Sequence, residues 1–152
     1  MANRVIALIN RLRYLRTTEV FQAKEVQDYI IYLNRHEQLF LKGETVEGDL
    51  TGFYSLKTQF ITEGKGYTSE GVTKYKKAGD PFFFLDTNDF FNSFKVKVGN
   101  EYFTIEANDK KDDGYLSEKY GHIIGLSEES KGKLVEFIKP YIVEVARKAA
   151  FG

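Results

Sequence analysis

The sequence predicts an α+β fold, with N-terminal helices, a central antiparallel sheet with a hairpin, and a long C-terminal helix packed on that sheet. Two helical regions are indicated by apolar residues that recur at three- and four-residue steps, one before residue 43 and one after residue 127. Between them, two alternating segments flank Gly99-Asn100, a dipeptide typical of hairpin turns. The chain has 152 residues and no internal repeat, so we expect a single domain spanning 1–152.

The N-terminal part of the sequence predicts two helices in succession. The first has an apolar stripe from Val5 to Leu15, and the second continues the same periodicity from Val20 to Phe40. Thr17 and Thr18 separate the two, since threonine is a common N-cap residue. Gly43 is a typical C-terminal stop for the second helix.

A glycine-rich, polar segment follows, from residue 43 to residue 79, and we predict it to be an extended interaction arm. Only residues 54–61 have the composition of a short helix, and a span this long without regular structure is usually functional. Aromatic and aliphatic side chains suit interface pockets better than the surrounding charges do. The predicted anchors on neighbouring copies are Phe53, Tyr54, Phe60, Ile61, Tyr67 and Tyr75.

The next segment, residues 81–106, is predicted to form much of the core of the domain. Thr87 is placed to cap a short helix that turns three phenylalanines toward the core, and residues 95–98 and 102–105 are expected to pair as a hairpin. The phenylalanines are Phe90, Phe91 and Phe94, and the other side chains expected to be largely buried are Val96, Val98, Phe103, Ile105, Phe137 and Ile138.

The last helix is predicted to start after Ser127, a good N-cap residue. Glu128 and Glu129 then suit the positive end of the helix dipole. Apolar residues continue at helical spacing as far as Ala149. Pro140 lies inside this pattern and is expected to kink or interrupt the helix.

Composition excludes several classes of function. With 22 basic and 22 acidic residues, the chain has no overall positive charge of the kind that nucleic-acid-binding proteins carry. The absence of cysteine excludes disulfides, zinc–thiolate sites and thiol catalysis. No segment of the sequence has the length of a membrane span, so we expect synthesis in the cytoplasm and no membrane partner.

Two segments resemble ligand loops but lack the decisive residues. The glycine spacing of residues 43–48 is that of a phosphate loop, yet Asp49 stands where the lysine belongs. Residues 109–114 resemble a calcium loop, yet Lys111 occupies a ligand position. The two histidines, His36 and His122, have no metal-ligand spacing. We therefore expect no cofactor, no metal and no enzymatic activity.

Four short motifs carry a resemblance to a known family. They are Gly52-Phe53-Tyr54-Ser55, the segment from Leu85 to Phe94, Glu118-Lys119-Tyr120-Gly121, and the segment from Ile124 to Ser130. In this order they resemble the small virion-morphogenesis proteins of tailed bacteriophages, which include tail-completion and head–tail joining components, and most of all versions from phages of gut Bacteroidota. Asn88 replaces a glycine of the family pattern, and asparagine is the residue that best tolerates the left-handed conformation in its place.

The resemblance implies a structural virion protein that forms a ring at the portal-proximal neck or tail. Its implied partners are other copies of itself, portal or adaptor proteins and tail proteins, with genomic DNA in the channel as a further candidate. One alternative is a nucleic-acid-binding accessory protein that uses the basic first helix, through Arg4, Arg11, Arg13 and Arg16. A second alternative, a small hydrolase, would need Asp86, Asp89 and His122 to converge in one pocket.

Overall fold

The computed structural model describes residues 17–100 and 102–151, and it has helices together with small antiparallel sheets. The predicted α+β class is confirmed. In chain order the elements are η1 (Thr17–Gln22), α2 (Lys24–Ile31), η2 (Tyr32–Lys42), α3 (Leu56–Ile61), β1 (Tyr67–Ser69), β2 (Val72–Lys74), α4 (Asp89–Asn92), β3 (Lys95–Val98), β4 (Phe103–Glu106), β5 (Lys110–Lys111), β6 (Gly114–Tyr115), α5 (Leu116–Tyr120) and α6 (Glu128–Phe151).

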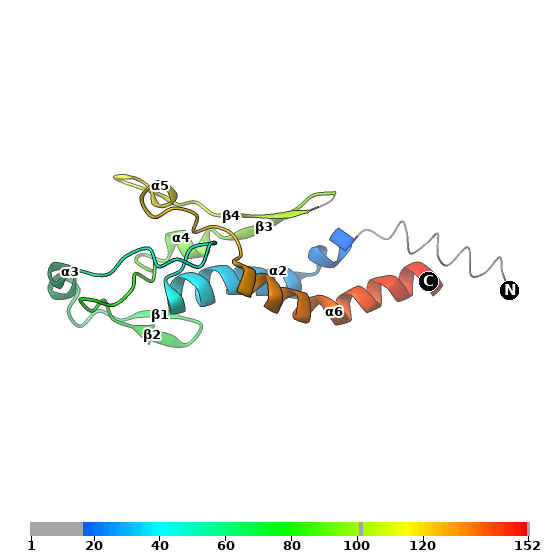
Figure 1. The fold of residues 1–152 in the computed structure, drawn as a ribbon, viewed down its shortest axis with the longest axis horizontal. Coiled ribbons are helices and arrows are strands. Elements are labelled where there is room, and N and C mark those ends of the chain that lie inside the picture. Colours follow the sequence, from blue (N-terminus) through cyan, green and yellow to red (C-terminus); the bar gives the residue numbers. More distant parts are fainter. Residues whose placement is uncertain (1–16, 101, 152) are drawn as a thin grey trace.

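A helical rod formed by α2 and η2, residues 24–42, runs along the middle of the molecule (Figure 1). Ile31 and Tyr32 both have helical dihedral angles, so the α-helix passes into the π-helix η2 without a break. The rod ends at Gly43, which has a φ of 67° and lies in the left-handed region, as the sequence predicts.

The second long helix, α6, begins beside the rod and extends beyond it (Figure 1). Ser127 caps it, because its hydroxyl oxygen accepts the backbone N–H of Ser130 at 3.2 Å. Pro140 neither breaks nor ends α6, which is assigned as one helix from residue 128 to residue 151. Pro140 is exposed, and this position lets water solvate the carbonyl that the proline leaves unpaired.

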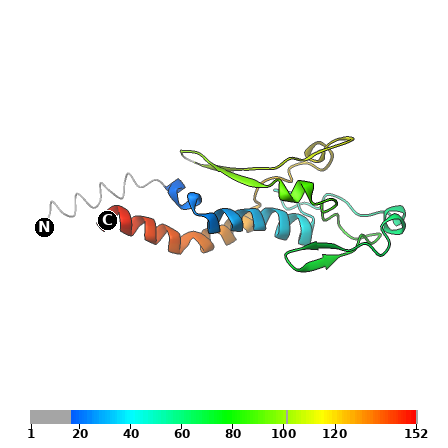
Figure 2. The ribbon, with the colours of Figure 1, turned by 180° about the vertical axis from the view of Figure 1, so that it is seen from behind.

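The predicted hairpin is β3–β4, in which Val96 pairs with Ile105 and Val98 pairs with Phe103. The predicted central sheet is not a single sheet. Among the described residues, β1–β2, β3–β4 and β5–β6 form three separate two-stranded sheets. The rod lies between the β3–β4 hairpin and α6, so α6 packs on the rod rather than directly on the sheet (Figures 1 and 2).

Burial along the hairpin is lower than predicted, because a two-stranded sheet is too narrow to cover its own inner face. Ile138 on α6 is buried, as expected, with 8% of its surface exposed. The other five side chains from β3, β4 and α6 stay half-buried, and all of them except Val98 pack against the core. These are Val96, Val98, Phe103, Ile105 and Phe137.

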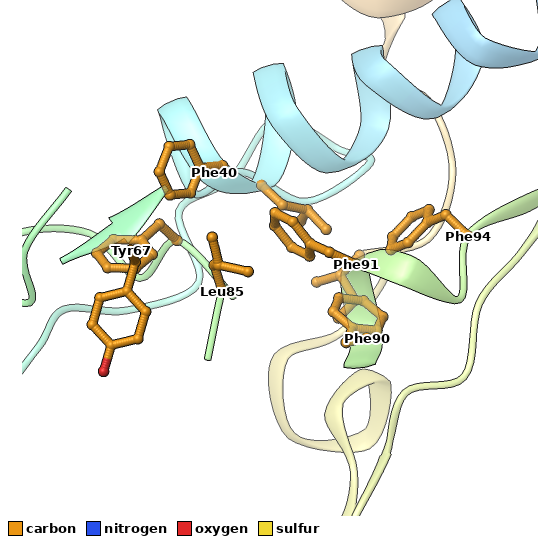
Figure 3. Packing of buried hydrophobic residues seen from close by; sticks show 9 residues of the cluster. Phe40, Tyr67, Leu85, Phe90, Phe91 and Phe94 are labelled. Atoms are coloured by element: carbon orange, nitrogen blue, oxygen red, sulfur yellow. The ribbon is translucent and has the colours of Figure 1, made fainter. Parts of the chain in front are cut away.

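The predicted aromatic core is confirmed. Phe90, Phe91 and Phe94 are 2%, 5% and 6% exposed, and the rings of Phe90 and Phe94 lie 5.0 Å apart in an edge-to-face arrangement. Figure 3 shows these side chains gathered with Phe40 on one side of the rod. Asn88, which precedes α4, has a φ of 68°, so it does adopt the left-handed conformation.

Three buried polar side chains of η2 fasten other segments to the rod. Asn34 and Gln38 hold residues 123–127 through hydrogen bonds to backbone groups, and His36 contacts β1. Among residues 17–100 and 102–151, no helix is both long enough and apolar enough to cross a bilayer.

Candidate contact surfaces

A group of exposed apolar side chains lies on α3, at the opposite end of the molecule from the C-terminus (Figure 1). Leu56, Phe60 and Ile61 are 58%, 64% and 73% exposed, and α3 has no buried residue. The helix is stabilised locally, since the hydroxyl oxygen of Ser55 accepts the backbone N–H of Thr58 at 3.1 Å. Exposed apolar side chains grouped on one short helix make α3 a candidate contact surface.

Phe53 and Tyr75 are also exposed, at 54% and 49%. We call the set of Phe53, Leu56, Phe60, Ile61 and Tyr75 the arm-tip surface. Four of its members are among the six anchors predicted from the sequence, and their exposure leaves that prediction open. Leu56 was missed, although its four-residue spacing from Phe60 places the two side chains on one helical face.

Of the other two predicted anchors, Tyr67 belongs to the core of its own chain, and the prediction is wrong for it. Tyr54 is half-buried and packs against the same core, and its predicted contact with a neighbour stays a prediction. Tyr67 is only 4% exposed, and its ring lies 5.5 Å from that of Phe83. The hydroxyl of Tyr54 accepts the backbone N–H of Phe83 at 3.2 Å. Burial raises the pKa of Tyr54 to about 12. Both tyrosines pack against the aromatic core because the chain folds back over it.

Two lysines of the arm hold the β1–β2 hairpin to the body. The Lys74 ammonium donates to the carbonyl of Phe40 at 2.9 Å, near the C-terminal end of η2, and burial lowers the pKa of Lys74. The Lys76 ammonium lies 4.5 Å from the ring centre of Tyr67 and 3.3 Å from the carboxylate of Asp86. The segment 43–79 is therefore not an extended arm throughout, since its hairpin packs on the body and its α3 end projects.

A broad cleft of about 1370 Å³ lies between the base of the arm, the segment after Phe82 and the β5–β6 hairpin. Phe84, in its wall, has a φ of 61°, an unusual value for a bulky residue. Four lysines and four aspartates line the cleft, so its charge favours neither an anion nor a cation. They are Lys76, Lys110, Lys111, Lys119, Asp86, Asp89, Asp112 and Asp113.

The residues of the hydrolase alternative are not all brought together in this cleft. Asp86 and Asp89 line it, whereas the exposed His122 pairs with Glu47, with 2.9 Å between Nδ1 and Oε1. The other histidine, His36, is buried, and its Nδ1 lies 2.8 Å from the hydroxyl of Ser69. Burial lowers the pKa of His36, so its neutral form is favoured.

The described ranges, 17–100 and 102–151, contain no group of three or more side chains that could hold a metal ion. The arginines of the nucleic-acid alternative, Arg4, Arg11, Arg13 and Arg16, lie outside the described residues. Their predicted contact with DNA or an acidic partner therefore stays a prediction.

No protein-family model, curated protein or solved structure matches this chain. The likeness to virion-morphogenesis proteins rests on the four short motifs quoted above. The arm-tip surface adds a physical reason to expect contact with another chain.

Proposed function

We propose that the protein is a structural component of a tailed-phage virion, which assembles with copies of itself into a ring at the portal-proximal neck or tail. The observation that carries this proposal is the arm-tip surface. Phe60 and Ile61 stay more than 60% exposed on a helix that contributes nothing to the core. Their burial in a partner would recover hydrophobic free energy that the isolated chain does not gain.

The tip offers a substantial part of the free energy that association needs. Full burial of a leucine, isoleucine or phenylalanine side chain is worth roughly 1.5–3 kcal/mol. Leu56, Phe60 and Ile61 are 58–73% exposed, so their remaining burial offers about 3–6 kcal/mol together. Ordering of side chains and loss of rotational freedom reduce that figure on binding. A ring requires a head-to-tail contact between two different surfaces, and a projecting tip on an elongated chain suits such a contact.

Point substitutions at the tip test the proposal more cleanly than deletion of residues 64–79, which would also remove the buried Tyr67. We expect the purified wild-type chain to form oligomers in native mass spectrometry and rings in electron micrographs. Phe60→Ser combined with Ile61→Ser should weaken self-association at least tenfold, with the melting temperature unchanged. Val135→Ser combined with Val143→Ser, two similarly exposed positions on α6, serves as the matched control.

A wild-type chain that remains monomeric at its highest soluble concentration would refute self-assembly. Equal losses in the tip and control variants would show that the tip is not the contact. The virion location is tested separately, by immunogold labelling of phage particles whose genome encodes this sequence. Label at the neck or tail is expected, and particles that contain no trace of the protein would refute a structural role.

A further inference from the structure

A second surface lies on α2 and the start of η2, where a groove of about 650 Å³ opens beside α6. Its apolar floor includes Tyr29, Tyr32 and Phe137, and its polar lining includes Glu25, Asp28, Glu70 and Arg35. None of the residues of the arm-tip surface lines this groove.

The floor is a ladder of stacked rings. The ring centres of Tyr29 and Phe137 are 4.1 Å apart with their planes 23° from parallel, and those of Tyr29 and Tyr32 are 6.0 Å apart at 14°. Tyr29 and Tyr32 each add a phenolic hydroxyl group to this aromatic surface. The floor therefore offers apolar surface together with hydrogen-bonding oxygen atoms.

The carboxylates of the groove retain free hydrogen-bonding capacity. Glu25 makes no ion pair or side-chain hydrogen bond with any described residue, and Asp28 stays 59% exposed although it pairs with Lys24. Glu70 is 46% exposed and lies 3.7 Å from Arg35, whose guanidinium also donates to the carbonyl of Phe91 at 2.8 Å. Three carboxylates thus lie near two cations, the engaged guanidinium of Arg35 and the ammonium of Lys24, so the groove keeps a net negative charge that suits a further cation.

The same sequence contains a segment with the complementary chemistry. Residues 1–16 hold four of the six arginines of the chain and no aspartate or glutamate, with apolar residues between the arginines. A guanidinium has five N–H donors in a planar fork that matches carboxylate oxygens, and it is more weakly hydrated than the ammonium group of lysine. Arginine is therefore the side chain that this combination of apolar floor and acidic rim binds best.

We propose that an arginine from residues 4–16 of a neighbouring copy binds in this groove, beside Glu25, Asp28 and Glu70. The inference rests on the proposed self-assembly and names a second contact within it. We choose a neighbouring copy as the occupant because η1 joins the rod on the face opposite the groove. Val20, in η1, packs in the cluster that contains Val26 and Ile30 of α2. At 100° per residue, Asp28, which lines the groove, points about 160–200° away from Val26 and Ile30.

A charge-swap experiment on the full chain tests the inference. Glu25→Arg combined with Asp28→Arg should weaken self-association by about tenfold or more, as loss of partly desolvated charge pairs does. Arg11→Glu combined with Arg13→Glu should do the same, and the four changes together should recover most of the affinity. Glu136→Arg combined with Glu144→Arg changes the net charge equally at two exposed positions of α6 and should leave self-association unchanged.

Dissociation constants are read from a dilution series in the analytical ultracentrifuge. An unchanged dissociation constant in the variant with Glu25→Arg and Asp28→Arg refutes this inference. A dissociation constant that does not recover when all four changes are combined refutes it too. Either result leaves the proposed self-assembly standing. If the reversal lowers the melting temperature without changing the mass, the groove binds its own chain, which also overturns the inference. A wild-type chain that never associates refutes both proposals.

Discussion

Asn34→Ala is expected to lower the free energy of unfolding by roughly 2–6 kcal/mol. The Asn34 side chain is fully buried; its Nδ2 donates to the carbonyl of Ile123 at 2.9 Å, and its Oδ1 accepts the N–H of Gly125 at 2.8 Å. Alanine leaves both backbone groups without a partner, at a cost of roughly 1–3 kcal/mol each. The total is a large share of the 5–15 kcal/mol that typically stabilises a domain.

Urea unfolding followed by circular dichroism measures this loss. Asn92→Ala is the matched control, because Asn92 is exposed and its replacement should change stability by less than about 0.5 kcal/mol. A loss below about 1 kcal/mol for Asn34→Ala would show that water or a loop shift satisfies the two backbone groups. In that case the view that Asn34 holds the loop to the rod is wrong.

Gln38 extends the test to a double-mutant cycle. Its Nε2 donates to the carbonyl of Gly125 and its Oε1 accepts the N–H of Ser127, both at 2.9 Å. Both amides fasten the same loop, so once Asn34 is lost the loop can leave the rod, and loss of Gln38 then costs less. The combined loss should fall short of the sum of the single losses by about 0.5–3 kcal/mol. Strict additivity would show that the two amides act independently.

The remaining predictions concern the aromatic core and the buried histidine. Phe94→Ala should lower stability by about 3–5 kcal/mol, because the side chain is almost fully buried, and an unchanged urea midpoint would show that the ring is not part of the core. His36 has a lowered pKa in the folded chain, so the unfolded chain takes up its proton first, and stability should fall as the pH drops below the unfolded pKa of about 6.5. His36→Gln should flatten the melting temperature between about pH 7 and pH 5, and an equally steep profile in that variant would assign the pH dependence to other groups.

Elements that depend on local signals were predictable from the sequence. Gly43 ends the rod, Ser127 caps α6 and Asn88 takes the left-handed turn, each through the conformational preference of one residue. The β1–β2 hairpin was missed because its turn has an unusual sequence. Glu70 and Gly71 both have positive φ, at 48° and 78°, as a type I′ turn requires, yet glutamate stands where asparagine or aspartate is the usual signal.

The burial of the polar side chains of η2 was harder to predict, because polar residues on a helix usually form the face that water covers. Asn34, His36 and Gln38 are all buried, and their hydrogen-bond partners come from segments 33 to 91 residues away in the chain. No local pattern specifies such partners. The burial of Tyr67 has the same cause, since only the folded-back hairpin decides whether an aromatic side chain of the arm faces the core or water.

The two halves of the arm have different roles: the β1–β2 hairpin stabilises the chain, whereas the α3 end is exposed and available to a partner. The hairpin half of the arm is held by Tyr67, Lys74 and Lys76, so substitutions there would damage folding and assembly together. At the α3 end, Phe60 and Ile61 are mostly exposed and lie outside the core, so their replacement should shift the unfolding transition little. Any loss of assembly in that variant is then a loss of contact and not of structure. An unfolding midpoint that falls with the tip substitutions would instead mean that α3 packs on its own chain in solution, and the tip would no longer be available to a neighbour.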